Sequence, residues 1–316
     1  MLSFLKPRLR DDGLLAVCPD GSGVAAALIT REGGGEPTLA LCERLPATGE
    51  DDIAARCREL AARRDCQRVP VTSIVQARDY TLLTVESPNV PAEELRAAVR
   101  WRIKDLIDFP IDEAVVDVFA MPPDKGGRED NVYVVAARAA PVHSRASELE
   151  GAGLPLRYLD IPELAMRNVA ALLPEDVGGT ALLHLDAGGG LLTLTRQGSL
   201  FLSRRFAPGL DALVHAGTAD GLADITQGRL DAVVIEVQRS LDYYESYFAQ
   251  PPVAGLVVAP LTQPVPGLTD YLASQLGLAV RQLDMNELID GASALTPELQ
   301  AYCFPAIAAA LRHDPQ

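Results

Sequence analysis

Residues 183–205, LHLDAGGGLLTLTRQGSLFLSRR, carry the pattern from which the fold can be predicted. An apolar run ends at an Asp and three consecutive glycines, and two runs of alternating character follow. Alternation with period two is typical of strands, and a glycine cluster is typical of a tight turn. The stretch therefore predicts three strands joined by short turns, TALLHLD, GLLTLTRQ and SLFLSRRF.

A comparable order occurs near the start of the chain, where residues 13–45 predict a three-stranded meander. An amphipathic helix at 49–65 and the strand VTSIVQ follow, just as a helical region and the strand VAGLVVAP follow the later meander. The chain thus reads as two related lobes. Two registers relate them: one aligns Asp20 with Asp186, and the other aligns Cys18 with Asp186 and makes the first turn an altered one.

The stretch between the two halves predicts a separate α+β unit. Helix 91–107, the strands EAVVDVFAM and VYVVAARA, and a helix from residue 141 make up this unit. We expect a first lobe at 1–79 that continues at 159–177, an inserted subdomain at 80–158 and a second lobe at 178–316. The C-terminal helix LTPELQAYCFPAIAAALRH, kinked or entered at Pro305, either stays in the second lobe or returns to the first.

Composition excludes several classes of protein. The chain of 316 residues has a net charge of -15 and a pI near 4.7, which argues against a nucleic-acid surface. No G-x-x-x-x-G-K-[ST] motif is present, and the five cysteines form no C-x-x-C pair. No stretch approaches the roughly 18 apolar residues of a membrane span. We therefore expect a cytoplasmic protein that reaches a membrane only through partners.

The Asp-x-Gly turns carry the most specific chemistry in the sequence. Two such hairpins, one in each lobe, are what an actin-like or sugar-kinase-like nucleotide cleft requires, because turn N–H groups face phosphates and the Asp orients a hydrated metal. A glycine-rich turn without a ligand is the equally weighted alternative. The candidate nucleotide-binding residues are Asp20, Gly21, Ser22, Asp186, Gly188, Gly189 and Gly190.

Two of the three expected ligand turns depart from that pattern. Residues 18–20 read Cys-Pro-Asp, which in one register places a carboxylate where phosphate belongs, at a cost of about 4 kcal/mol for unit charges 4 Å apart. After the strand VAGLVVAP, the expected glycine turn is replaced by residues 259–262, and Pro260 lacks an N–H group. The sequence therefore predicts no cofactor, with ATP and Mg²⁺ as the alternative.

Three further features stand out. Asp160 lies where a strand feeds a helix, so it is a candidate kinase base, although a helix N-cap is the favoured interpretation. Trp101 lies on a helix and points almost opposite to its apolar stripe. We expect Trp101 to contact either the first lobe or another protein. The stripe consists of Leu95, Val99, Ile103, Leu106 and Ile107.

Several segments resemble the PilM family of type IV pilus assembly, with the MSHA-biogenesis branch, MshI, as the nearest likeness. They are ELRAAVRWRIKDLIDFPIDEAVVDVFAM, YVVAARAAPVHSRASELEGAGLPLRYLDIPELAMRN, LLHLDAGGGLLTLTRQGSLFLSRRF and VVIEVQRSLDYYESYF. The resemblance implies an actin-like ATPase fold of the α/β class, two-lobed and related to ribonuclease H, with an inserted subdomain like that of FtsA. The cytoplasmic domain of GspL is similar in the same way.

The resemblance also implies a functional role. Family members bind the short cytoplasmic tail of a bitopic inner-membrane protein of the PilN type, and several bind ATP. Trp101 and Phe109 are our candidates for the peptide groove. We therefore expect a non-catalytic scaffold that works with other pilus assembly proteins, peripheral to the inner membrane. The alternatives are an ATP-dependent switch that uses Asp186 with its glycines, and a small-molecule kinase; the sequence leaves the oligomeric state open.

Overall fold

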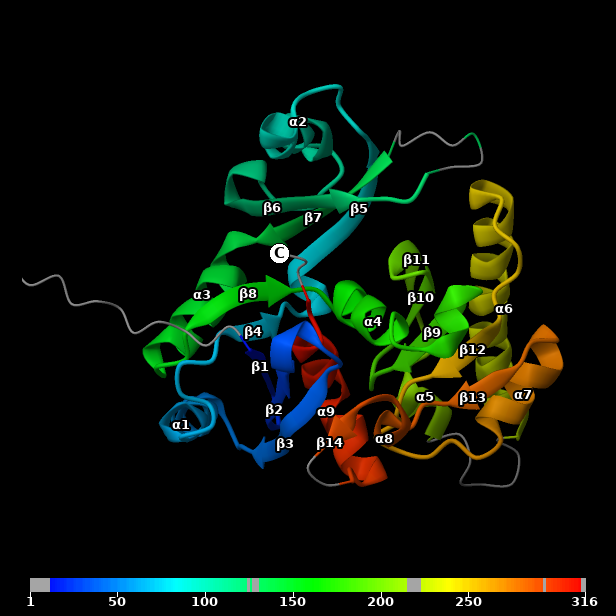
Figure 1. The fold of residues 1–316 in the computed structure, drawn as a ribbon. Coiled ribbons are helices and arrows are strands. Elements are labelled where there is room, and N and C mark those ends of the chain that lie inside the picture. Colours follow the sequence, from blue (N-terminus) through cyan, green and yellow to red (C-terminus); the bar gives the residue numbers. More distant parts are fainter. Residues whose placement is uncertain (1–11, 124–125, 127–130, 215–222, 292–293, 314–316) are drawn as a thin grey trace, which may run out of the picture. The chain divides into compact units, whose positions relative to one another are not determined.

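The computed structural model describes residues 12–123, 126, 131–214, 223–291 and 294–313 (Figure 1). These residues divide into two compact units. Unit 1 takes in the described residues up to 80, together with 137–165 and those from 285 onward, and unit 2 takes in 81–136 and 166–284. Each unit has a central sheet of its own.

Unit 1 is built on a six-stranded sheet in the order β14-β3-β2-β1-β4-β8. The predicted meander is confirmed, because β1, β2 and β3 pair antiparallel along the chain. Beyond it, β4 runs parallel to β1 and β8 runs parallel to β4. The strands are β1 Gly13–Asp20, β2 Gly23–Thr30, β3 Thr38–Pro46, β4 Val71–Ile74, β8 Leu156–Asp160 and β14 Asp290–Gly291.

Helices cover both faces of this sheet (Figure 1). On one face, α1 (Glu50–Ala62) and α3 (Ala139–Gly151) share a core with alternate residues of β1 and β2, such as Leu15 and Val17. On the opposite face lies α9 (Pro297–Ala310), which packs against β1 to β4. Because successive strand residues point to opposite faces, these strands are apolar at nearly every position.

Helix α9 begins at Pro297, within the predicted segment LTPELQAYCFPAIAAALRH. Thr296 is its N-cap, since its hydroxyl oxygen accepts a hydrogen bond from the Leu299 N–H at 3.2 Å, and Pro297 takes the first helical position. Pro305 lies inside the helix and does not start it. Of the two alternatives for this helix, the structure shows the return to the unit that holds the N-terminal meander.

Unit 2 holds a five-stranded sheet in the order β11-β10-β9-β12-β13. The second predicted meander forms β9, β10 and β11, and β12 runs parallel to β9 as β4 does to β1. The long helix α6 packs on β10 and β11. The elements are β9 Thr180–Leu185, β10 Gly190–Arg196, β11 Ser199–Phe206, β12 Gly255–Val258, β13 Val280–Gln282, α6 Ala223–Phe248 and α7 Leu268–Leu276.

The predicted insertion contributes a three-stranded sheet in the order β5-β7-β6, with α2 packed on it. Its strands and helix are β5 Tyr80–Glu86, β6 Ala114–Ala120, β7 Asn131–Arg138 and α2 Ala92–Ile103. Val99 and Ile103 of the predicted stripe lie in its core. Leu106 does not, because α2 ends at Ile103, and its side chain is exposed.

The boundaries of the units differ in detail from the sequence expectation. The sequence analysis assigns residues 137–158 to the insertion, but they belong to unit 1, where Leu149 and Leu154 complete its core. The remaining short elements are α4 Pro162–Ala170, α5 Leu210–Val214, α8 Met285–Leu288, and the 3-10 turns η1 Glu32–Gly34, η2 Ala77–Asp79, η3 Ile111–Glu113 and η4 Pro174–Val177.

Candidate functional site

In the turn between β1 and β2, the Asp20 carboxylate accepts hydrogen bonds from within the turn itself. Asp20 pairs with Gly23 across the hairpin, so Gly21 and Ser22 form the turn. The Ser22 N–H and hydroxyl both donate to Asp20 Oδ1, each at 2.7 Å. Arg44 on β3 lies 3.6 Å from Asp20 Oδ2 and supplies the counter-charge. Asp20 thus acts as the cap of its turn, as an Asx turn predicts.

The turn between β9 and β10 uses Asp186 in the same manner. Its Oδ1 accepts hydrogen bonds from the Gly188 N–H at 2.9 Å and the Gly189 N–H at 2.7 Å. The Asp186 N–H closes the turn by donating to the Gly189 carbonyl at 2.9 Å. Both hairpins therefore place an Asp carboxylate on turn amides, which matches Asp20 with Asp186 and favours the slid register of the two that the sequence allowed.

The segment before α5 packs directly onto this second turn. A Cβ atom added to Gly209 would lie 2.2 Å from the Gly189 nitrogen, and one added to Gly190 would lie 2.5 Å from the Phe206 ring. The Leu210 N–H donates to the Asp186 carbonyl at 2.7 Å. Glycine is therefore required at positions 190 and 209 for close packing of the chain on itself.

The third expected ligand turn, after β12, has a buried backbone at Ala259 and Pro260. The N–H of Ala259 donates to the Leu183 carbonyl at 2.8 Å, and both Ala259 and Pro260 are buried. The chain therefore presents no bare backbone at these two positions after β12.

Asp160 is an ion-pair partner within unit 1. Its side chain is 3% exposed; Oδ2 lies 3.1 Å from Arg312 Nη1, and Oδ1 accepts from the Ile161 N–H at 2.9 Å. The Arg312 guanidinium also stacks 4.2 Å above the Tyr158 ring. The carboxylate anchors the end of α9 to β8, and both of its oxygens are engaged in these contacts. This arrangement does not favour the kinase base.

The two predicted partner-binding aromatics have different surroundings. Trp101 on α2 is 78% exposed, as the helical spacing predicted. Phe109 is 7% exposed and lies in the core of the insertion with Val99 and Ile103. A ring in that place stabilises the insertion, so a partner contact through Phe109 requires this core to open.

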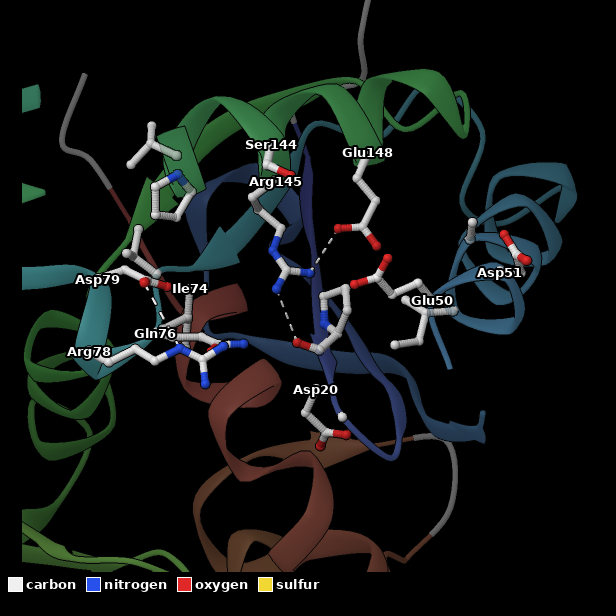
Figure 2. A pocket seen from close by; sticks show the side chains of 17 residues that line it. Asp20, Glu50, Asp51, Ile74, Gln76, Arg78, Asp79, Ser144, Arg145 and Glu148 are labelled. Carbon is white, nitrogen blue, oxygen red and sulfur yellow. Dashed lines mark hydrogen bonds and ion pairs between the residues drawn. The ribbon is translucent and has the colours of Figure 1, made fainter. Parts of the chain in front are cut away.

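A pocket of about 580 Å³ lies in unit 1 (Figure 2). Four separate segments form it: the β1–β2 turn, the start of α1, the chain after β4, and α3. Asp20 and Gly21 are the predicted site residues that it brings together with others. Its lining residues are Pro19, Asp20, Gly21, Glu50, Asp51, Ile53, Ala54, Ile74, Val75, Gln76, Arg78, Asp79, Pro141, Val142, Ser144, Arg145 and Glu148.

Arg145 connects two segments of the pocket wall, α3 and the β1–β2 hairpin. Its Nη1 lies 3.2 Å from Glu148 Oε2, one turn further along α3, and its Nη2 donates to the Pro19 carbonyl at 3.3 Å. The first hairpin is thereby fixed to α3, as the dashed lines in Figure 2 show. Only Asp20 and Gly21 of this site are indicated by the sequence, because no local motif marks its other lining residues; the acidic start of α1, GEDD, is a further signal.

Comparison with solved structures places this geometry among known folds. A chain of the PilM–PilN type IV pilus biogenesis complex is 20% identical, with a TM-score of 0.74 over 94% of this chain and 97% of that chain. A Bacteroides thetaiotaomicron protein of unknown function with an actin-like ATPase fold is 11% identical, with a TM-score of 0.50 over 96% and 98% of the two chains. This chain has the actin-like ATPase fold.

The fold prediction is thereby confirmed. The cytoplasmic domain of EpsL, an inner-membrane component of the type II secretion system of Vibrio cholerae, is 12% identical over 92% of this chain and 94% of that one, and its TM-score of 0.49 is too low to support an inference. No protein-family model and no curated protein sequence matches the chain. Within the described residues, no helix has the length and hydropathy needed to cross a membrane.

Proposed function

We propose that this protein is a non-catalytic, actin-like scaffold of type IV pilus biogenesis that binds the cytoplasmic tail of a PilN-like inner-membrane protein. The observation that carries the proposal is the match over nearly the whole of both chains to a structure of a PilM–PilN complex. We place the protein in the cytoplasm, peripheral to the inner membrane through that partner. The sequence segments that resemble MshI support the MSHA branch.

The two Asp-capped turns support a scaffold without nucleotide. A phosphate that approached Gly188 and Gly189 would have to displace the Asp186 carboxylate from both N–H groups. If the carboxylate stayed, two like charges 4 Å apart would repel by about 4 kcal/mol at an effective dielectric constant near 20. We therefore expect no cofactor.

The pocket of unit 1 is our assignment for the partner contact. It is the described cavity that contains the predicted residues Asp20 and Gly21, and its walls come from the meander lobe and from α3. Its volume is in the range that holds a few side chains of a bound segment. The exposed Trp101 on α2 remains a candidate for a second contact.

Site-specific photo-crosslinking tests this assignment. A benzoylphenylalanine placed at Val142, in the pocket, is expected to capture a single-pass membrane protein through its cytoplasmic tail, identified by mass spectrometry of the crosslinked peptide. The same probe at Val177, which is 70% exposed in unit 2, is the control and is expected to capture none of it. Equal capture at both positions, or none at Val142, contradicts the assignment.

One observation favours the nucleotide switch as the second candidate. Asp20 and Asp186 occupy equivalent places in their turns, which is the register that the switch requires. Calorimetry with Mg-ATP separates the two functions: we expect no saturable binding in the micromolar range, whereas the switch predicts it. If binding is seen and Asp186→Ala abolishes it, the scaffold without nucleotide is refuted.

A further inference from the structure

We infer that the pocket of unit 1 selects a short basic peptide segment with aliphatic side chains, and that Glu50 and Glu148 clamp its cationic group. The inference rests on the proposed function, because it takes the occupant to be a partner's tail. It goes further by naming the chemistry of that tail and the residues that recognise it.

The charges of the pocket walls are unbalanced. Five carboxylates line the cavity with the guanidinium groups of Arg78 and Arg145, and Arg44, outside the lining, is the counter-charge of one of the five, Asp20. Arg145 is already engaged with Glu148 and the Pro19 carbonyl, and Arg78 is 80% exposed with its Nε 3.9 Å from Asp79. Within the described part of the chain, Glu50 has no ion-pair partner. The cavity therefore carries excess negative charge that a cationic occupant neutralises.

Two of these carboxylates, those of Glu50 and Glu148, are placed to bind one cationic group together. Glu50 comes from the first turn of α1 and Glu148 from the last part of α3, and their carboxylates point toward one another across the pocket in Figure 2. Asp51 points away from them. A guanidinium or ammonium group placed between Glu50 and Glu148 donates charge-assisted hydrogen bonds on two sides, since each carboxylate offers two acceptor oxygens.

The remaining lining residues indicate which class of molecule, bearing a cationic group, the pocket binds. Ile53, Ile74, Val75 and Val142 form the apolar part of the wall, and no aromatic side chain lines the cavity among the described residues. The lining offers no aromatic ring on which a nucleobase could stack, and its carboxylates repel phosphate groups, so it does not favour nucleic acids or nucleotides. Aliphatic side chains beside a Lys or Arg do fit, and a short peptide segment provides both.

The charge of the occupant also agrees with its proposed source. Cytoplasmic segments next to membrane spans carry an excess of Lys and Arg. A chain with a net charge of -15 attracts such a segment over distance, and the attraction weakens as salt rises. Charge complementarity therefore selects a membrane protein's tail over an acidic or neutral peptide.

Selection from a random peptide library tests the inference on the intact chain. A phage-displayed library of random dodecapeptides is selected on the immobilised protein and on Glu50→Gln and Glu148→Gln variants. We expect peptides with clustered Lys or Arg beside Leu, Ile or Val. Each variant should bind the best peptide on the order of tenfold more weakly, and high salt should weaken wild-type binding as well.

A matched control separates the pocket from general surface charge. The double variant Glu93→Gln/Glu94→Gln removes two exposed carboxylates on α2 and is expected to enrich the same peptides as the wild type. Because Glu50 lies outside the Arg145 pair, its variant reports on the clamp even if Glu148→Gln perturbs α3.

Every outcome decides the inference. Enrichment of neutral or acidic peptides, unchanged binding by Glu50→Gln, equal loss in the α2 control, or no enrichment overturns it. In each of these cases the proposed function still stands if the probe at Val142 captures a membrane protein. If the crosslink also fails, the proposed function fails with it.

Discussion

The two Asp-capped hairpins have the same cap but different surroundings. In unit 1, Asp20 caps a two-residue turn that lines a cavity and leaves Gly21 with open space around its Cα. In unit 2, Asp186 caps a longer turn on which Gly209 packs at backbone contact. The two hairpins thus share the hydrogen bond from a turn N–H to an Asp carboxylate, but they differ in the segments that pack on the turn. One turn is free to meet a ligand, and the other is a packing element.

The largest difference in stability between the two turn regions is expected when one methyl group is added to each. Gly209→Ala places a Cβ 2.2 Å from the Gly189 nitrogen, so the free energy of unfolding should fall by about 3 kcal/mol. Gly21→Ala meets nothing within 4 Å and should change it by less than about 0.5 kcal/mol. Urea unfolding of both variants measures the difference, and equal effects would refute the contrast.

Acid lability should also distinguish the units, through His184 in β9. Burial lowers its pKa from 6.5 to about 4. Between these values the unfolded state binds the proton and the folded state does not, so stability is full above pH 6.5 and falls as the pH drops toward 4, by up to about 3 kcal/mol. His184→Leu should flatten this slope in urea titrations over that range. An unchanged slope would show that other groups cause the acid lability.

The caps themselves should have a smaller effect. Asp186→Ala leaves two N–H groups without their acceptor and should cost about 1 to 2 kcal/mol. Asp20→Ala should cost about 0.5 kcal/mol, because only one backbone N–H, that of Ser22, loses its acceptor there. Thermal unfolding of both variants gives the ranking. A larger effect at Asp20 would contradict the view of unit 2 as the packed hairpin.

A small effect, comparable to that of Asp20→Ala, is expected at Arg44, the counter-charge of Asp20. The pair spans 3.6 Å at the surface, so Arg44→Met should lower the free energy of unfolding by less than about 1 kcal/mol, with a difference that shrinks in salt. Arg44 also lies 4.1 Å above the Tyr302 ring, and Met retains part of that packing. A loss that salt does not change would assign the effect to the ring contact.

The order of strands and helices could be predicted from the sequence, because local periodicity and turn residues set it. The run of residues 183–205 forms β9, β10 and β11 as expected. The start of α9 is also signalled in the sequence, by Thr296 followed by Pro297, and of the two interpretations of Pro305 the entry of the helix is wrong, because Pro305 lies inside it. Leu106 joins the predicted stripe wrongly, because helix ends are hard to locate without a clear cap.

The pocket could not be predicted in the same manner. Glu50, Arg145 and Glu148 are ordinary surface residues of two helices when read locally, and only tertiary packing brings them to one cavity. Phe109 shows the same limit in reverse, since the sequence analysis makes it a candidate for a partner contact and the core of the insertion buries it. Periodicity describes one element at a time, whereas a site of this kind depends on how four segments meet.

The place of α9 has a consequence for how the protein is made. This helix covers the face of β1 to β4 that α1 and α3 leave bare, and Arg31 and Arg312 tie its end to the rest of unit 1. During translation, the N-terminal meander leaves the ribosome long before α9 exists. One apolar face of the nascent meander is therefore exposed to solvent until α9 has been synthesised. We expect chaperones to bind this face during that time.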